Sequence, residues 1–368
     1  MKIALVVPGG VDRSGEYRVI PVLLALIRRL ACVHEVHVYA LYQEASAGCW
    51  DLAGAKIHNV GDSWTRWRAV GAIVAEHRRA RFDLVHSIFS GACGLIAVAA
   101  AMRLRLPSLV HIAGGELVAL PEIGYGGRQG LKGRVREALV LRGASAITAA
   151  SEPILASLRE LGLQARRVPL GVDLQAWPPR SPRRRDSAAP ARLIHVASLN
   201  RVKDQTTLLR ALAALADAGV DFTMDIVGED TLHGEIQALA AQLGLDRRIR
   251  FHGFQTQHSL RPMIEAADMH VMSSRHEAGP LSLLEAAVVG VPTVGTAVGH
   301  MAEWTPSACL TVAVGDWQGL ASQIGLLLAD EELRLRIGMA AQARALLENA
   351  DETARRFQLI YADLIAPQ

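Results

Sequence analysis

Short apolar runs rich in β-branched residues alternate with longer helical patterns along this chain, and this alternation constrains the fold more than any other feature. Such alternation is typical of parallel sheets whose faces are covered by helices. In the first half we expect strands over residues 2–7, 35–41, 83–87, 108–112 and 144–149, with helices up to about residue 33 and over 91–105. The fold class predicted for this half is α/β, with a doubly wound, Rossmann-like domain.

The alternation starts again after a polar segment. Residues 177–192, WPPRSPRRRDSAAPAR, are rich in Pro, Arg and Ser and show no apolar periodicity, which indicates an interdomain linker with solvated arginines. Beyond it we expect strands over 193–197, 222–227, 248–252, 268–272 and 292–295, and helices over 204–218, 232–243, 280–289, 316–329, 331–348 and 351–365. We therefore predict an amino-terminal domain over 1–176, a linker over 177–191 and a carboxyl-terminal domain over 192–350, with the last helix, 351–366, packing back on the first domain.

The charge, the apolar stretches and the cysteines of the chain limit its partners and its location in the cell. The 39 Lys and Arg against 36 Asp and Glu leave a net charge of +3, which is too small for a nucleic-acid footprint. The opening MKIALVVPGG suits a buried strand better than a signal peptide, and the mild apolar stretch 91–102 is too short to cross a bilayer. The four cysteines show no Cys-x-x-Cys spacing and predict neither a disulfide framework nor a zinc site, so we expect a cytoplasmic protein.

The most specific local pattern is RHEAGPLSLLEA, residues 275–286, which follows an expected strand. Gly279 and Pro280 suit the start of a helix and Gly290 suits its end, so Glu277 should lie in the entering loop and Glu285 within the helix. A helix amino terminus at the carboxyl edge of a sheet offers free amides to a phosphate. From spacing alone, one salt-bridged and one exposed glutamate would explain the pattern equally well.

Glu277 and Glu285, followed by GVPTVGTAVGHMAE, resemble the paired-glutamate motif of glycosyltransferase family 4, whose members are retaining enzymes with the GT-B fold. Weaker pieces stand in the family's order over nearly the whole chain: DLVHS, HIAGGE, RVPLGVD, ASLNRVKD and DIVGED. The resemblance implies two Rossmann-like domains that face each other across a cleft and bind a nucleotide-diphosphate sugar, with UDP or GDP as the nucleotide. The acceptor, whether a glycan, a lipid-linked sugar or a small molecule, is not identified.

The resemblance also implies roles for individual residues. Glu285 would bind the ribose hydroxyls, and Glu277 would lie near the reacting face of the transferred sugar. Lys203 matches the lysine that neutralises the diphosphate, and His111 would lie against the donor sugar or its leaving phosphate, although without the resemblance a core histidine is the simpler interpretation. With Lys203 and Glu277, His111 completes the predicted catalytic set.

Several positions depart from the family pattern. Ser198 stands where the family has a diphosphate-binding arginine, and Arg201 is either its substitute or a surface turn residue. Gly279 replaces an aromatic residue and Pro280 offers no amide, so donor contacts there pass to neighbours such as Leu281. In the first domain, Gly10 and Gly15 are candidates for phosphate contact, although their spacing differs from the family's tight Gly-Gly.

No Asp-x-Asp occurs in the sequence, which argues against a carboxylate pair that holds a metal. The charge of the departing diphosphate would then be stabilised by Lys203, helix amino termini and Arg201, so we expect no metal and no other cofactor. Two competing functions stay open. One is a GT-B epimerase or hydrolase acting on a nucleotide sugar, and the other is a non-catalytic binding protein, which Ser198 and Gly279 would suit.

Two basic segments of the first domain stand apart from these motifs. Trp64 and Trp67 interleave with Arg66 and Arg68, and a second segment carries Arg128, Lys132, Arg134, Arg136 and Arg142. Both segments would suit an anionic membrane, such as the inner membrane face, or an acidic acceptor. Solvated helix faces with packed indoles are the favoured interpretation.

Overall fold

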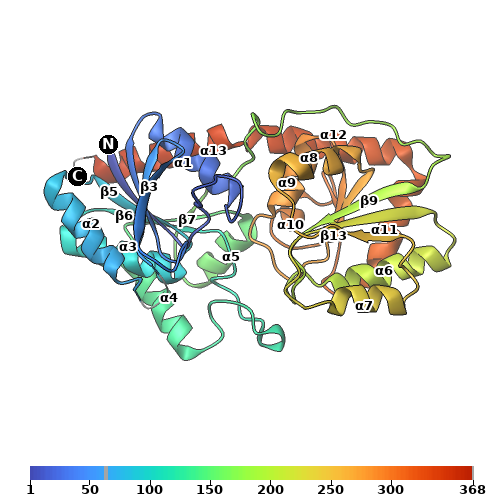
Figure 1. Cartoon of the computed structure of the whole chain (residues 1–368), viewed down its shortest axis with the longest axis horizontal. Helices are drawn as coiled ribbons and strands as arrows, with labels where there is room; N and C mark the ends of the chain where they lie inside the picture. The colour runs from blue at the N-terminus through green and yellow to red at the C-terminus, as the bar shows by residue number, and fades with distance from the viewer. Residues whose placement is uncertain (62–64, 367–368) are drawn as a thin grey trace. The chain divides into compact units, whose positions relative to one another are not determined.

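The computed structural model describes residues 1–61 and 65–366, which form two compact units (Figure 1). Unit 1 consists of Met1–Asp173 together with Asn349–Gln368, and unit 2 of Leu174–Glu348. The chain therefore leaves unit 1 after Asp173 and returns to it at Asn349.

Unit 1 is built on an eight-stranded sheet in the order β3-β4-β2-β1-β5-β6-β7-β8. All neighbouring strands are parallel except β3 and β4, which form an antiparallel hairpin at one edge. The strands are β1 (Lys2–Val7), β2 (Glu35–Ala40), β3 (Gly48–Leu52), β4 (Ala55–Asn59), β5 (Leu84–Ile88), β6 (Ser108–Ile112), β7 (Ala146–Ala149) and β8 (Arg166–Arg167).

Helices cover both faces of this sheet because its central strands are apolar on both sides. Alternate residues of β1 enter different cores: Ile3 and Leu5 pack with α1 and α13, whereas Ala4 and Val6 pack with α2 and α3. The helices are α1 (Pro21–Ala31), α2 (Arg68–Arg79), α3 (Gly91–Leu104), α4 (Leu131–Gly143), α5 (Glu152–Glu160) and α13 (Ala350–Ile365), with a 3₁₀ turn η1 at Pro121–Ile123.

The last helix of the sequence belongs to unit 1, and Figure 1 shows α13 in red beside the blue α1. Asn349 caps it, since its side chain accepts hydrogen bonds from the amides of Asp351 and Glu352 at 2.9 and 3.1 Å. Phe357 is fully buried, and its ring centroid lies 4.7 Å from that of His86 and 5.3 Å from that of His111. The helix thus completes one of the two cores of unit 1.

We expect Phe357→Leu to lower the free energy of unfolding by about 1 kcal/mol, because the smaller side chain leaves space beside two buried imidazoles. Leu359 on the same helix is 53% exposed, so Leu359→Ala should change stability by less than about 0.5 kcal/mol. Urea denaturation of the full chain, followed by circular dichroism, measures both values. Equal losses in the two variants would show that Phe357 does not anchor the helix.

Unit 2 is built on a six-stranded parallel sheet in the order β11-β10-β9-β12-β13-β14. Its strands are β9 (Ala191–Val196), β10 (Phe222–Val227), β11 (Ile249–Phe251), β12 (Met269–Val271), β13 (Thr293–Thr296) and β14 (Leu310–Val312). Its helices are α6 (Gln205–Asp217), α7 (Glu235–Gln242), α8 (Gln257–Ala266), α9 (Leu281–Val288), α10 (His300–Trp304), α11 (Trp317–Ala329) and α12 (Glu331–Leu347). From β9 the chain winds outward to β11 and then returns to β12 and continues to β14, so the topological switch point lies between β9 and β12.

The segment expected to be a solvated linker lies against unit 2 instead. Trp177 is fully buried, and the Arg183 guanidinium pairs with buried Asp268 at 2.8 Å and donates to the carbonyl of Ala266 at 2.6 Å. Buried Arg334 of α12 donates to the Arg183 carbonyl at 2.6 Å. The expectation of solvated arginines fits Arg184, which is exposed and pairs with exposed Glu332, but it does not fit Arg183. The difference arises because partners far along the chain fix this segment.

Candidate active site

The loops that follow β9 and β12 meet at the switch point of unit 2, where open α/β sheets bind their ligands. The Ser273 hydroxyl donates to the Lys203 carbonyl at 2.8 Å, and the Arg275 amide donates to the Val202 carbonyl at 2.7 Å. These two hydrogen bonds hold the loops together. They place Lys203 and Glu277, predicted from separate motifs, in one site.

Lys203 and Glu277 form an ion pair in this site. The Lys203 Nζ lies 2.5 Å from Glu277 Oε1, which also accepts a hydrogen bond from the Ser274 hydroxyl at 2.6 Å. The Lys203 side chain is 25% exposed, so its charge lies within reach of a ligand at the carboxyl edge of the sheet. The structure therefore brings together two of the three predicted catalytic residues.

Glu285 lies on α9, as the sequence predicts, and Glu277 lies in the loop before it. Gly290, with φ of +75°, follows the end of the helix. The Glu285 carboxyl is buried, and it accepts a hydrogen bond from the side-chain amide of Gln257 at 3.1 Å. Burial raises the pKa of Glu285 to about 8, against a smaller opposing effect of the Gln257 hydrogen bond. The sequence did not indicate this shift, because burial depends on distant elements.

Position 279 leaves no room for a Cβ because His300, which the sequence did not single out, lies beside it. A Cβ at Gly279 would lie 2.8 Å from Nε2 of His300, which is fully buried at the start of α10. His300 Nε2 has no hydrogen-bond partner among the described residues, and its ring stacks on Trp304 with centroids 6.2 Å apart. The signal available was its position four residues after β13, at the carboxyl edge where polar side chains gather.

Gly228, in the motif DIVGED, has a structural reason to be glycine. Its φ is +151°, and a Cβ there would lie only 2.1 Å from the carbonyl oxygen of Ala197. The Leu199 amide then donates to the Glu229 carbonyl at 2.8 Å, which continues the pairing of β9 and β10 into the loops. This close approach shapes the loop that carries Ser198 and Lys203.

The remaining predicted donor contacts of unit 2 are spread around this loop. Ser198 accepts a hydrogen bond from Gln205 through its carbonyl at 3.1 Å, and Leu281 is the first residue of α9, so its amide lies at the helix amino terminus. Arg201 is 59% exposed and pairs with Glu235 at 2.8 Å, so the structure directs it to a different partner from that of Lys203. The donor-binding roles of all three stay predictions.

In unit 1, Gly10 and Gly15 lie in the loop after β1, and both have positive φ. A Cβ at Gly10 would lie 2.5 Å from Cγ1 of Ile20, whereas Gly15 closes a turn by donating from its amide to the carbonyl of Asp12 at 3.0 Å. Helix α1 begins only at Pro21, so neither glycine lies at a helix amino terminus. Their contact with phosphate stays a prediction.

His111 lies in β6 and is fully buried. Its Nδ1 is 3.0 Å from the Thr148 hydroxyl, and Phe357 of α13 packs against its ring. Burial lowers the pKa of His111 to about 3, so the imidazole is neutral at physiological pH. This environment is that of a core histidine, which was the interpretation without the resemblance. The catalytic role of His111 stays a prediction.

A buried acidic pair in unit 1 was missed by the sequence analysis. The Ser90 amide donates to Glu116 at 3.1 Å, and the Ser90 hydroxyl donates to Glu137 at 2.6 Å. Burial raises the pKa of Glu116 and raises that of Glu137 to about 7. Glu116 follows β6 within the quoted HIAGGE motif, which was the available signal, whereas Glu137 on α4 joins the pair only through folding.

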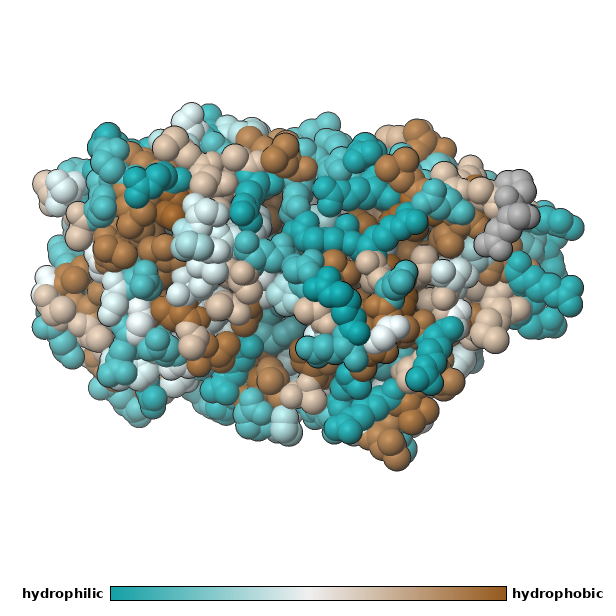
Figure 2. Space-filling model, turned by 180° about the vertical axis from the view of Figure 1, so that it is seen from behind, coloured by the Kyte–Doolittle hydropathy of each residue, from teal (hydrophilic) through white to brown (hydrophobic). Residues whose placement is uncertain are grey.

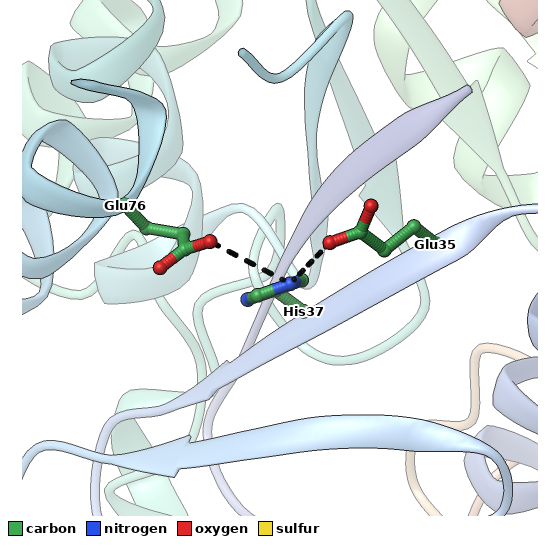
Figure 3. Close-up of side chains that lie close together, drawn as sticks. All are labelled: Glu35, His37 and Glu76. Atoms are coloured by element: carbon green, nitrogen blue, oxygen red, sulfur yellow. Dashed lines mark hydrogen bonds and ion pairs between the residues drawn. The ribbon is translucent and has the colours of Figure 1, made fainter. Parts of the chain in front are cut away.

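Glu35, His37 and Glu76 lie close enough together to suggest a metal site, and Figure 3 shows the imidazole between the two carboxylates. However, the Lys2 ammonium lies 3.0 Å from Glu35 and 2.6 Å from Glu76, so both carboxylates already have a cation. Lys2 and Glu35 are also the first residues of β1 and β2. They lie at the amino ends of the strands, whereas a ligand site is expected at the carboxyl ends. We interpret this cluster as a structural ion pair network.

The basic segments differ in how well they can be placed. Trp64 lies outside the described residues, and Trp67 is 52% exposed. The second basic segment begins at Arg128, before α4, and its other four basic residues lie on α4. Across residues 1–61 and 65–366, each helix falls short of the length or the apolar character that crossing a membrane requires.

Comparison with solved structures shows the class of fold. Sucrose-phosphate synthase from Thermosynechococcus elongatus aligns over 100% of both chains with a TM-score of 0.83 at 19% identity. The Anabaena protein Alr3699/HepE in complex with UDP-glucose aligns over 99% of this chain and 100% of its own, with a TM-score of 0.76 at 19% identity. With two Rossmann-like units, the chain has the GT-B fold of glycosyltransferases, which confirms the predicted fold class.

Sequence comparison adds the family. The model of glycosyl transferases group 1 matches residues 182–344, and that of the glycosyl transferase 4-like domain matches residues 19–172. The N-acetyl-alpha-D-glucosaminyl L-malate synthase of Bacillus anthracis is 30% identical over 47% of this chain and 45% of its own length. A GDP-mannose-dependent alpha-(1-6)-phosphatidylinositol dimannoside mannosyltransferase of Mycobacterium tuberculosis is 35% identical over 34% of each chain. The matched segments thus span less than half the length of these relatives.

The two models together cover most of the chain, in the order expected for the two units. The protein belongs to glycosyltransferase family 4.

Proposed function

We propose that this protein transfers a sugar from a nucleotide-diphosphate sugar to an acceptor, with retention of configuration and without a metal ion. The observation that carries the proposal is the Lys203–Glu277 pair at the switch point of unit 2, directly before the amino terminus of α9. A cation, a carboxylate and free helix amides at this edge suit a ligand that combines a diphosphate with hydroxyl groups.

The nucleotide we propose is UDP or GDP. A Mycobacterium tuberculosis relative is named as GDP-mannose-dependent, and the Anabaena protein of similar fold was solved with UDP-glucose. Buried Glu285 would accept hydrogen bonds from the ribose hydroxyls. Such donors stabilise the ionised carboxylate and would offset the cost of its burial.

The chemistry begins with departure of the nucleotide diphosphate, whose negative charge increases as the bond to the sugar breaks. The Lys203 ammonium and the first amides of α9, including that of Leu281, would stabilise this charge. Lys203 must then share its charge between Glu277 and the leaving group, which couples the two residues. No metal is required in this scheme.

Retention requires that the acceptor attack from the face that the leaving group vacates. We place Glu277 beside the transferred sugar, where its carboxylate would orient hydroxyl groups near the reacting carbon. We assign acceptor binding to unit 1, where Ser90 and Glu116, which follow β5 and β6, form a polar cluster with Glu137 of α4.

A nucleotide panel with EDTA present tests the donor and the absence of a metal together. One of UDP and GDP should stabilise the protein by about 2.7 kcal/mol at about 100 times its Kd, while ADP and CMP should have little effect. Thermal unfolding of the full chain measures the shift. No stabilisation by either nucleotide would contradict the proposed donor class.

Turnover gives the second half of the test. Activity that disappears on chelation and returns with manganese would contradict a metal-independent transfer. Mass spectrometry of the products separates transfer from the alternatives, because a hydrolase or an epimerase would consume the donor without joining its sugar to an acceptor.

A further inference from the structure

The outer face of α4 carries a row of exposed aliphatic side chains. Leu131, Val135 and Leu139 are 78%, 50% and 61% exposed and lie four residues apart. At about 100° per residue they fall in one sector of about 80° and form a continuous stripe. An exposed apolar stripe is unfavourable in water unless something covers it.

Basic side chains border this stripe on both sides. Arg134 lies on one side, Lys132 and Arg136 lie on the other, Arg142 is in the last turn, and Arg128 precedes the helix. In the part of the chain that the structure describes, none of these five forms an ion pair within 4.0 Å. The only acidic residue of α4 is Glu137, which is buried on the opposite side against Ser90. The exposed face is therefore apolar at its centre and exclusively positive at its borders.

A hollow of about 370 Å³ adjoins the stripe. It is lined by Leu95 of α3 and by Leu131, Lys132, Val135, Arg136 and Leu139 of α4. At the lower edge of Figure 2, where α4 lies, hydrophobic side chains adjoin hydrophilic ones. Aliphatic groups and the stems of basic side chains together make a surface that suits acyl chains below a charged headgroup layer.

We propose that this face of α4 docks the protein on an anionic lipid bilayer. The stripe would enter the boundary between headgroups and acyl chains, while the basic side chains would contact lipid phosphates. The proposal does not depend on which sugar or nucleotide the protein uses. It replaces the simpler interpretation of these basic residues as a solvated helix face, because that interpretation leaves the aliphatic stripe unexplained.

The charge of the face argues against a second copy of this chain as its occupant. A symmetric dimer through α4 would bring two sets of the same five basic side chains together without acidic partners on that face. A bilayer with anionic headgroups supplies both the negative charge and the apolar layer. The favourable contribution is expected to be about 1 kcal/mol for each basic residue near the surface, or about fivefold in partition coefficient.

Vesicle flotation of the full chain tests the proposal. With vesicles of phosphatidylglycerol and phosphatidylcholine in equal parts at low ionic strength, most of the protein should float, and high salt should release it. Vesicles of pure phosphatidylcholine should recover much less protein. Leu131→Ser with Leu139→Ser should reduce partition at least about tenfold, and Lys132→Gln with Arg134→Gln about twentyfold.

Matched variants control for surface changes elsewhere. Met339→Ser with Leu347→Ser removes two exposed apolar side chains of α12, and Arg78→Gln with Arg103→Gln removes two exposed charges of α2 and α3. Each control pair should change partition by less than about twofold. Thermal unfolding of every variant confirms that it is folded, which is expected because all the replaced side chains are exposed.

Three outcomes would overturn the proposal. The first is a wild-type protein that does not float with anionic vesicles. The second is flotation of the α4 variants that equals that of wild type, and the third is binding that is equal on neutral vesicles and insensitive to salt. A dimer in solution that the α4 variants dissociate, together with no vesicle binding, would assign the face to a second copy instead. Nucleotide-induced stabilisation of the same samples reports on the donor site separately, so the two proposals can fail independently.

Discussion

Glu285→Gln should make the protein more stable than wild type at about pH 9 and weaken its binding of the nucleotide. The carboxyl is buried, and this burial raises its pKa from 4.5 to about 8. The folded state therefore holds the proton more tightly than the unfolded state. Glu285 contributes most to stability below about pH 4.5, and this contribution is lost as the pH rises through about 8. Gln is neutral throughout and avoids the loss.

The expected effect on stability is large because the Glu285 carboxylate is almost completely shielded from solvent. A pKa difference between 4.5 and about 8 corresponds to about 5 kcal/mol at most, and we expect a gain on the order of 3 kcal/mol at about pH 9. Urea denaturation at about pH 6 and pH 9 measures it. Glu332→Gln is the control, since this exposed carboxylate of the same unit should change stability by less than about 1 kcal/mol.

The same variant should bind UDP or GDP about 10- to 100-fold more weakly, because a neutral amide accepts hydroxyl donors less strongly than a carboxylate. Isothermal titration measures this loss. If Glu285→Gln is less stable than wild type at alkaline pH, then ionisation of the buried Glu285 carboxyl does not lower the free energy of unfolding. Unchanged nucleotide affinity would remove Glu285 from the proposed donor site.

Lys203→Met should lower kcat/KM about 30- to 1000-fold, which corresponds to a loss of about 2 to 4 kcal/mol of transition-state stabilisation. The substitution keeps an apolar stem of similar length and removes the charge that we assign to the departing diphosphate. Steady-state kinetics with the donor varied measures the effect. An unchanged kcat/KM would contradict the proposed role.

Arg201→Met is the matched control for this experiment. Arg201 is an exposed cation only two residues earlier in the same loop, but it pairs with Glu235, so its loss should change kcat/KM by less than about threefold. Lys203→Met also leaves Glu277 without its cation, and thermal unfolding must show that the variant is folded. If Arg201→Met is as inactive as Lys203→Met, Arg201 does replace the missing diphosphate arginine.

Much of the architecture was predictable because strand and helix patterns are local. The apolar runs at residues 2–7 and 222–227 are strands with those bounds, and Asn349 caps α13 between the two helices expected over 331–348 and 351–365. The placement of Glu277 before α9 and of Glu285 within it followed from Gly279, Pro280 and Gly290, whose backbone preferences act over a few residues.

What the sequence did not reveal depends on contacts between distant segments. His111 is buried because Phe357 packs against it, and Arg183 is anchored by Asp268 and Arg334. The β3–β4 hairpin was also missed, since its turn at Ala53-Gly54 has positive φ at both residues but lacks the usual Asn-Gly or Asp-Gly. Local periodicity carries no information about such partners.

The return of α13 to unit 1 has a consequence for biosynthesis. Unit 2 is encoded by one uninterrupted stretch, Leu174–Glu348, and can fold as soon as that stretch has left the ribosome. Unit 1 must wait for Phe357 and Tyr361, the buried aromatic residues of α13, although most of its chain is translated first. The usual amino-to-carboxyl order of domain maturation is then reversed, and until α13 has been translated the nascent chain presents a partly uncovered sheet to chaperones.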